Sequence, residues 1–547
     1  MSILTISMMW MISVPSAWAG TLVVDPEAGP HATLAEAVEV AAPGDVIELA
    51  PGTYAERVVV RTDGLTIRGL DRQGVVLEAS DPFAPGDGSL VLDGVGLQVE
   101  QLTISGMDLG RAVRVAGGQL TLSRVTLRRG AMRGNGGLLF ADRYSTVVLS
   151  DVRVHGADAG NGSGGLVAVD GTLRAVRTWF VGGASQRRGG ALYCGPESSC
   201  SVVDSVFANN AAAEGGAVHL AGGSGPWRRN HFCANDAASN DALDGRGGAF
   251  WSAGEVTHES SVFQDNRAEQ AGGALFVAGG TANLRNVDLL GNQAFGDGAA
   301  IASTDLASVD LRNTLIAWSG GSSRHTVVTG DGALTAAYNA FFENSGQFEL
   351  DVPLPASNQS TDGADPQIAY VSGDCQATDV VPGPTSSLID AGDLAILDPD
   401  GSVSDIGSTG GPFTCNRTET PGDGVDEDCD GTELCYVDAD GDGFGEPTVP
   451  PILSQDLDCL DPGEVDNMAD TCLGFDDALD QDADGIPDGC DQDDDEPDVT
   501  ISPLEGGSGC SCGASSGGTG AGVALLGLLL LSRRRDRSDR ARPGRPG

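Results

Sequence analysis

The sequence predicts an all-β protein built as a solenoid of short strands, and two repeated marks lead to that prediction. Between residues 136 and 301 a doubled glycine followed by a short apolar run occurs seven times, with alanine as the second residue of the last copy. The first glycines are 28, 25, 26, 32, 25 and 26 residues apart. A second mark, an aromatic residue or leucine followed three residues later by asparagine, precedes most copies. Two marks in phase over several periods indicate a structural repeat.

The period and the apolar runs favour strands. About 25 residues is too short for the paired helices of helical solenoids and for a propeller blade. The apolar runs are short, often alternate, and are bounded by Gly, Asn, Asp and Ser, which is typical of strands joined by turns. Glycine permits a corner with φ > 0, a repeated Asn can pair amide to amide, and a repeated Phe can stack inside. We therefore interpret as structural the pairs Phe207 and Asn210, Phe232 and Asn235, Phe263 and Asn266, and Leu289 and Asn292.

These motifs resemble two known groups of proteins. The Phe-x-x-Asn and Gly-Gly-Ala marks are similar to the passenger repeats of the chlamydial polymorphic outer-membrane proteins. The wider layout resembles the pectin-lyase-like superfamily. The resemblance implies a right-handed parallel β-helix, which is a single-stranded solenoid, but it implies little about activity because such folds host many functions.

The N-terminus predicts export and a capped solenoid. Residues 1–19 combine an apolar run with Ala17-Trp18-Ala19, which is typical of a signal peptide cleaved before Gly20. Residues 31–42 carry apolar side chains on one helical face, and Pro43-Gly44-Asp45 should end this helix. An amphipathic helix would cover the open end of the solenoid. The helix and the strands after it resemble the opening of many pectin-lyase-like domains.

Short strands at 65–67, 75–77, 90–92, 102–104, 113–115 and 120–122 should continue the solenoid until the glycine repeat begins. The series of Asp-Pro, Asp-Gly and Gly-Gly-Pro turns between 365 and 412 resembles the end of many bacterial β-helix domains. We therefore place the β-helix domain at residues 20–412. In an exported chain, twelve cysteines suggest disulfides, and the close pairs Cys194/Cys200 and Cys429/Cys435 are candidates.

Residues 413–498 form an acidic segment whose spacing predicts calcium loops. The formal net charge of the whole chain is -47, which argues against nucleic acid as a partner. Residues 480–491 place acids at loop positions 1, 3, 5, 9 and 12 with glycine at 6, the arrangement that wraps oxygens around Ca²⁺. Two less complete copies begin at 438 and 426, and a solvated acidic linker is the alternative. The expected ligands are Asp480, Asp482, Asp484, Ile486 through its carbonyl, Asp488, Asp491, Asp438, Asp440, Asp442, Glu446, Asp426, Asp428 and Asp430. The loop at 480–491 resembles a thrombospondin type 3 repeat, and residues 424–438 resemble the metal-binding repeats of myxobacterial secreted proteins.

The C-terminus predicts an anchor. Residues 499–520 are a Gly/Ser-rich linker that contains Cys510 and Cys512, and residues 521–547 combine a short apolar segment with an Arg-rich tail. The apolar segment of eleven residues is short for a bilayer span. The three features together resemble the MYXO-CTERM sorting signal, which implies anchoring at the cell surface or outer membrane through the cysteine region. An ordinary membrane tail anchor is the alternative.

The chain shows no linear catalytic motif. Asp204 and Asp265 lie near solenoid corners and are the sort of residue that could act in catalysis, although ordinary surface charge is the simpler interpretation. We therefore expect a surface-anchored, non-enzymatic protein that binds cell-surface glycan or a neighbouring cell through the flank of the solenoid. A polysaccharide lyase or glycoside hydrolase acting on acidic polysaccharide, and a structural envelope component, are the alternatives.

Overall fold

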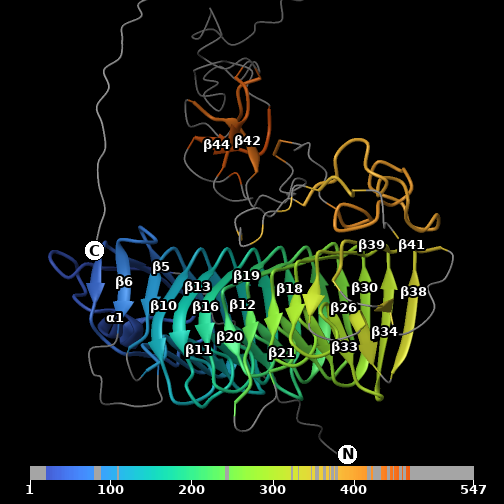
Figure 1. Cartoon of the computed structure of the whole chain (residues 1–547). Helices are drawn as coiled ribbons and strands as arrows, with labels where there is room; N and C mark the ends of the chain where they lie inside the picture. The colour runs from blue at the N-terminus through green and yellow to red at the C-terminus, as the bar shows by residue number, and fades with distance from the viewer. Residues whose placement is uncertain are drawn as a thin grey trace, which may run out of the picture.

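The computed structural model describes residues 20–468, with internal gaps of four residues or more at 79–87, 241–244, 351–356, 361–364, 376–379, 415–420, 423–432, 440–443 and 455–458. The described chain forms a parallel β-helix that runs from β1 to β41, followed by a small antiparallel unit of β42, β43 and β44 (Figure 1). The predicted fold class is therefore confirmed.

Each coil of the solenoid contributes a strand to each of three faces. The first face holds the strands that follow the doubled glycines: β11 (Leu139–Ala141), β14 (Val167–Val169), β17 (Leu192–Cys194), β21 (Val218–Leu220), β25 (Phe250–Ser252), β29 (Leu275–Val277) and β33 (Ile301–Ser303). The second face holds β12 (Ser145–Ser150), β15 (Thr172–Val176), β18 (Ser199–Val203), β22 (Gly223–Arg228), β26 (Val256–Glu259), β30 (Gly280–Arg285), β34 (Ala307–Arg312) and β38 (Ala333–Ala337). The third face holds β10 (Thr126–Ala131), β13 (Arg153–Asp158), β16 (Trp179–Ala184), β19 (Val206–Ala208), β23 (His231–Cys233), β27 (Val262–Gln264), β31 (Asp288–Leu290), β35 (Leu315–Ala317) and β39 (Ala340–Phe342).

The remaining strands extend these faces at both ends. The N-terminal coils contain β1 (Thr21–Val24), β2 (Val46–Leu49), β3 (Gly52–Tyr54), β4 (Val58–Val60), β5 (Leu65–Gly69), β6 (Val75–Glu78), β7 (Leu90–Glu100), β8 (Thr103–Ser105) and β9 (Val113–Ser123). Two-residue strands beside the third face are β20 (Ala211–Ala212), β24 (Asp236–Ala237), β28 (Arg267–Ala268), β32 (Gln293–Ala294) and β36 (Gly320–Gly321). The C-terminal coils add β37 (His325–Gly330), β40 (Phe348–Leu350) and β41 (Gln359–Ser360), and the small unit contains β42 (Leu434–Val437), β43 (Ile452–Leu453) and β44 (Glu464–Val465).

The N-terminal helix is shorter than the predicted span of 31–42. Helix α1 covers Leu34–Val40, with the side chain of Thr33 accepting a hydrogen bond from the Glu36 backbone as its N-cap. His31 is instead bridged to Val24 of β1. Leu34, Ala37 and Val38 are buried against the first coils, so the helix caps the solenoid as expected.

Two separate structural requirements explain the doubled glycine. All seven first glycines have positive φ, for example 62° at Gly189 and 65° at Gly215. The second glycine of each pair meets the backbone of the next coil, since a Cβ at Gly190 would lie 2.2 Å from the carbonyl oxygen of Gly216. The corner conformation was predicted from the sequence, but the contact with the next coil was not.

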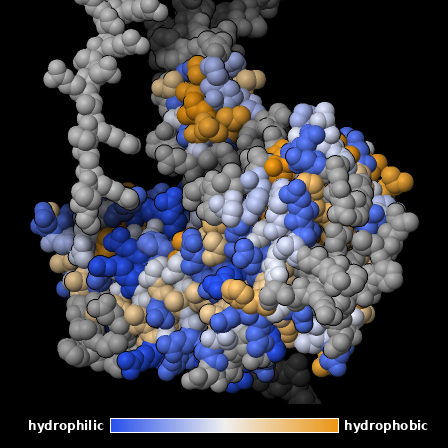
Figure 2. Space-filling model, viewed as in Figure 1, coloured by the Kyte–Doolittle hydropathy of each residue, from blue (hydrophilic) through white to orange (hydrophobic). Residues whose placement is uncertain are grey.

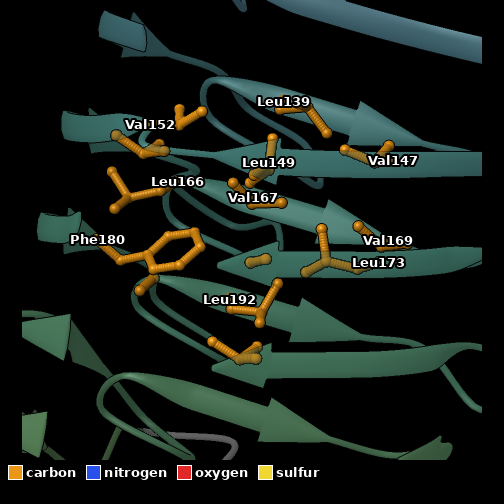
Figure 3. Close-up of a cluster of buried hydrophobic side chains, with 14 of the residues drawn as sticks. Leu139, Val147, Leu149, Val152, Leu166, Val167, Val169, Leu173, Phe180 and Leu192 are labelled. Carbon is orange, nitrogen blue, oxygen red and sulfur yellow. The ribbon is translucent and has the colours of Figure 1, made fainter. Parts of the chain in front are cut away.

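Stacked side chains fill the interior as predicted. The rings of Phe180, Phe207, Phe232 and Phe263 are parallel within 10°, with centroids 4.5–4.8 Å apart. Aliphatic residues of all three faces complete the core (Figure 3). Beside the rings, the buried amides of Asn210, Asn235, Asn266 and Asn292 form a ladder with Nδ2–Oδ1 distances of 2.9–3.0 Å.

Three disulfides occur among the described residues. Cys194 pairs with Cys200, as the spacing suggested. The suggested pairing of Cys429 with Cys435 is wrong, because Cys435 pairs with Cys459. A third disulfide joins Cys233 of the third face to Cys375, far away in the sequence.

Residues 380–414 form a strap that runs back along the solenoid. Val380, Leu388 and Ile406 pack against Leu290 and Leu315 of the third face. Polar contacts fix the strap at the corner between the second and third faces. These are Asp393 N to Asn313 Oδ1 at 2.8 Å, Asn286 Nδ2 to Asp405 O at 2.8 Å, and Arg229 Nη1 to Phe413 O at 3.3 Å.

Candidate binding face

An outward row of aromatic side chains runs along the first face. Each strand of this face has three residues; the outer two point into the core and the middle one points outward, as the alternation of a strand requires. Strand register aligns the middle residues of successive coils. The row is Phe140, Ala168, Tyr193, His219, Trp251, Phe276 and Ala302.

The centre of the row is a stack of three rings. The His219 imidazole lies 3.9 Å from the Trp251 ring at an interplanar angle of 9°, and 5.5 Å from the Tyr193 ring at 30°. His219 is 1% exposed, whereas Tyr193 and Trp251 remain partly exposed on either side of it. The stack therefore presents two aromatic surfaces that are held in place by a buried histidine.

A second row runs beside the rings and is charged. The residue just before each doubled glycine occupies this position, and Arg188, Glu214, Arg246 and Ala271 are bridged in successive coils. Arg188 Nε lies 3.0 Å from Glu214 Oε2. The Arg246 guanidinium lies over the Phe276 ring, 5.2 Å from its centroid. Glu214 Oε2 is also 3.7 Å from His219 Nε2, so the charged row contacts the aromatic row.

The electrostatics of this contact favour a neutral histidine. Burial lowers the pKa of His219 to about 4, although Glu214 opposes this shift. Burial alone would raise the pKa of Glu214, but its interactions with His219 and Arg188 outweigh burial and hold that pKa below its usual value. The pair therefore consists of a neutral imidazole and a carboxylate at neutral pH. A histidine enclosed between two rings is poorly placed to exchange protons with a substrate.

The other edge of the face carries acidic groups. Asp170 follows β14 directly, and burial, then Asp142 and Glu197, raise its pKa. Burial, then Asp170, raise the pKa of Tyr193. Tyr193, at one end of the three-ring stack, thus lies between arginines on one side and carboxylates on the other.

The two acidic residues considered for catalysis from the sequence do not form a site. Asp204 lies at the corner between the second and third faces with a φ of 51°, and it pairs with Arg229 at 2.5 and 2.7 Å. Asp265 lies at the other corner of the third face with a φ of 53°, where it accepts hydrogen bonds from Tyr370 and Ser372. Each carboxylate is thus held by a structural partner, and the two are on different corners.

Most residues predicted to bind metal or to anchor the chain lie outside the described residues. Of the three calcium loops, the structure describes Asp438 and Glu446, while Asp440, Asp442 and all the named ligands of the 426 and 480 loops fall outside it. Residues 1–19, Cys510, Cys512 and the apolar segment at 521–531 are also outside. Within the described ranges, no group of three or more His, Cys, Asp or Glu side chains is arranged to hold a metal. The same ranges contain no helix long and apolar enough to cross a membrane.

A shallow hollow of about 300 Å³ on the second face is a separate feature. It is polar, lined by Thr66, Gln98, Gln119 and Thr121, and it lies in the N-terminal coils away from the aromatic row. It contains no titratable side chain.

The aromatic row was not predicted from the sequence, although the sequence contains a pattern that indicates it. The fourth residue after the first glycine is aromatic or histidine in five of the seven copies: Phe140, Tyr193, His219, Trp251 and Phe276. In a strand that follows a glycine corner, this position points outward. This pattern is easily overlooked, because an aromatic residue within an apolar run is ordinarily assigned to the hydrophobic core.

Comparisons with known proteins agree with the fold only. No family model and no curated protein match the chain. Among solved structures, it is similar to the pectate lyase Pel9A, at 15% identity and a TM-score of 0.35 over 72% of this chain and 96% of that one. It is similar to the mannuronan C-5 epimerase AlgE4 A-module of Azotobacter vinelandii at 14% identity and a TM-score of 0.28, over 59% of this chain and 93% of that one. The pectin methylesterase PemA from Erwinia chrysanthemi gives 11% identity and a TM-score of 0.23, over 63% and 94%. At these values the comparisons assign no activity, substrate or site residue to this chain, which has a parallel β-solenoid fold.

Proposed function

We propose that this protein is an exported, surface-anchored and non-enzymatic binding protein that holds a cell-surface glycan along the first face of its solenoid. The observation that supports this proposal is the outward row of Tyr193, His219 and Trp251 beside the charged row of Arg188, Glu214 and Arg246. Aromatic faces pack against the apolar faces of sugar rings, and guanidinium and carboxylate groups hydrogen-bond their hydroxyl or acidic substituents. Because the two rows run through several successive coils, they suit an extended polymer.

The absence of enzymatic activity is proposed from the state of the titratable groups. His219 is buried and neutral, Asp204 is paired with Arg229, and Asp265 is held by Tyr370. A polysaccharide lyase or glycoside hydrolase remains the alternative, supported only by the resemblance in fold. A structural envelope component is the second alternative.

The stalk and the anchor complete the proposal. The acidic segment 413–498 would bind Ca²⁺ and act as a stiff spacer, and Cys510 and Cys512 would serve the anchoring of the chain at the outer membrane. Both parts rest on the sequence patterns and on the resemblances that they carry.

The test is a binding screen of the full chain against acidic and neutral polysaccharides, with assays for unsaturated products. Trp251→Ala should weaken binding by about tenfold or more, which corresponds to a loss of about 1.4 kcal/mol. The matched control is Tyr144→Ala, because Tyr144 is 74% exposed and lies outside the row. Equal losses of binding in both variants would contradict the placement of the glycan-binding site on the first face. Release of 4,5-unsaturated uronides by the purified protein would contradict the non-enzymatic assignment.

A further inference from the structure

The third face of the solenoid differs in character between its two ends. Towards the C-terminal end its outward residues are apolar and pack beneath the strap. Towards the N-terminal end the strand register defines two outward rows. One row contains Thr126, Arg153 and Trp179, and the other contains Arg128 and His155. Arg153, His155 and Trp179 are exposed, the last at 40%. This end of the face therefore presents basic and aromatic side chains at its surface.

The N-terminal coils are basic for so acidic a protein. Residues 101–190 contain twelve of the 31 arginines against five aspartates and no glutamate, although the whole chain has a net charge of -47. Figure 2 shows hydrophilic residues gathered over these coils, where Figure 1 labels β10, β13 and β16. A local excess of positive charge in such a chain marks a surface that attracts anions.

Three guanidinium groups surround Thr126. Arg72 Nε donates to Thr126 Oγ1 at 3.2 Å, and Arg72 Nη2 donates to two backbone carbonyl oxygens at 3.0 Å each, so this group is fixed beside the threonine. Arg153 is the register partner of Thr126 in the next coil, and Arg128 lies two positions further along the same strand. Adjacent strands are about 4.8 Å apart, so the three cations lie over one small area. We define the arginine cluster as Arg72, Arg128, Arg153, His155 and Trp179.

The positive charge of the arginine cluster is not neutralised by carboxylates of the described chain. None of its three guanidinium groups forms an ion pair there, and two acids of the same coils are paired with other arginines. Asp151 pairs with Arg177 at 2.8 Å, and Glu78 with Arg129 at 4.0 Å. The buried Nε of Arg128 also has no hydrogen-bond partner among the described residues. The cluster therefore retains both charge and donor capacity for a ligand.

The like charges of the arginine cluster act on one another. Burial, then Arg153, lower the pKa of Arg72 to about 10, although Asp151 raises it. Burial, then Arg128 and Arg153, lower the pKa of His155. A nearby positive charge disfavours the protonated form of a base, so these shifts agree with the close placement of the groups. A bound anion would relieve this repulsion.

The arrangement of the donors favours a phosphate group attached to a sugar. A phosphate ester carries a charge of about -1.5 to -2 at pH 7 and three strong acceptor oxygens, so it can accept hydrogen bonds from several directions at once. Planar guanidinium groups donate to such oxygens in pairs. The Arg153 guanidinium lies over the Trp179 ring, 5.7 Å from its centroid, so an aromatic surface for a sugar ring adjoins the cations. The strongly acidic remainder of the chain argues against nucleic acid, which is densely charged.

We propose that the arginine cluster binds the phosphate group of a phosphorylated sugar, whose ring packs against Trp179. Arg128 and Arg153 donate hydrogen bonds to the phosphate oxygens, and Arg72, which its backbone contacts hold in place, contributes its positive charge. The contacts are charge-assisted but exposed, so binding is reversible and weakened by salt. This site is separate from the aromatic row of the first face and does not depend on the function proposed for that row.

The first test uses modification of the full chain with phenylglyoxal, followed residue by residue by mass spectrometry. Millimolar glucose 6-phosphate should slow the reaction of Arg128 and Arg153 several-fold, whereas glucose should not. Inorganic phosphate should slow it less than glucose 6-phosphate, because it makes no contact with Trp179. Arg61 and Arg174 are the internal controls, since the Arg61 side chain is 69% exposed and Arg174 is exposed on the second face. Their rates should not change.

The second test compares variants by calorimetry with glucose 6-phosphate. R128Q/R153Q should lower the affinity about tenfold or more, whereas R61Q/R174Q removes the same charge elsewhere and should have little effect. Trp179→Ala should lower the affinity to that for inorganic phosphate. Phe295→Ala is its matched control, because Phe295 is 55% exposed and lies beneath the Arg267 guanidinium, 4.7 Å from it.

Three results would overturn the proposal. The first is equal protection of all four arginines, or equal affinity in the two double variants. The second is equal affinity of the wild-type chain for glucose 6-phosphate and inorganic phosphate, since the sugar would then make no contact. The third is protection that only vesicles of anionic lipid produce, which would assign the cluster to a membrane surface. Trp251→Ala should leave all these readouts unchanged, so failure of glycan binding on the first face is distinguishable from failure of this proposal.

Discussion

Asn235 donates its side-chain amide to Oδ1 of Asn266 at 2.9 Å, and the same Oδ1 accepts the backbone N–H of Asn235 at 3.1 Å. Asn266 in turn donates to the carbonyl oxygen of Phe232 at 2.9 Å. Its own backbone N–H donates to Oδ1 of Asn292 in the next coil at 3.1 Å. One fully buried asparagine thus joins three coils by hydrogen bonds, which explains why this residue recurs at the corner.

The first prediction concerns this ladder. Asn266→Ala should lower the free energy of unfolding by about 1–3 kcal/mol because it leaves buried polar groups of the neighbouring coils unsatisfied. Phe263→Ala should lower it by about 3–4 kcal/mol because it removes one ring of the stack. Urea denaturation of each variant measures the change. Gln293→Ala, at an exposed position of β32, is the control and should have little effect. Midpoints equal to wild type for both core variants would contradict the ladder.

The ladder and the Phe stack were predictable because Phe and Asn recur at the same positions of successive coils. The strap was not, because its contacts join Asn313 to Asp393 and Arg229 to Phe413, pairs that no local pattern relates. The same holds for the Cys233–Cys375 disulfide. The aromatic row of the candidate site follows the repeat and was in principle readable. The charged row beside it could not be predicted without knowing which residues lie side by side in adjacent coils.

The second prediction concerns His258, which is fully buried among Trp227, Phe250 and Phe263. Burial lowers its pKa from 6.5 to about 3. The unfolded chain therefore binds a proton below pH 6.5 that the folded chain does not, so stability is lost as pH falls from about 6.5 toward 3. At pH 5 the loss should be about 2 kcal/mol. His258→Phe should reduce this dependence, whereas His31→Gln, beside β1, should not. Parallel pH profiles for wild type and His258→Phe would contradict the assignment.

The third prediction concerns Asp288, where the pH dependence has the opposite sign. Its carboxyl is buried beneath the strap and accepts hydrogen bonds from the backbone and hydroxyl of Ser408, yet burial raises its pKa to about 7. The folded chain therefore holds a proton that the unfolded chain has released between pH 3.8 and 7, and stability falls as pH rises through this window, by up to about 1.4 kcal/mol per pH unit.

Asp288→Asn should remove this loss and raise the thermal midpoint at pH 8 relative to wild type. Asp204→Asn is the contrasting variant, because it breaks an ion pair with Arg229 and should destabilise the chain at the same pH. Thermal unfolding at pH 5 and pH 8 separates the two. If the difference in thermal midpoint between wild type and Asp288→Asn is the same at pH 5 and at pH 8, Asp288 is ionised at both pH values and the prediction is wrong.

The last prediction concerns calcium. Residues 415–498 carry 28 net negative charges and few apolar residues, so without a counterion their carboxylates repel one another. Ca²⁺ should turn these carboxylates into shared ligands, with a dissociation constant of roughly 0.1–1 mM, as for extracellular modules. The loop at 480–491 should bind best, because only it has acids at both positions 9 and 12. Asp484→Ala should therefore weaken binding more than the matched change Asp426→Ala in the least complete loop. Calorimetry of the full chain measures the uptake, and its radius of gyration should fall in millimolar Ca²⁺ and recover with a chelator. No uptake at about 2 mM Ca²⁺ would leave the segment as an acidic linker, since extracellular calcium modules bind within this range.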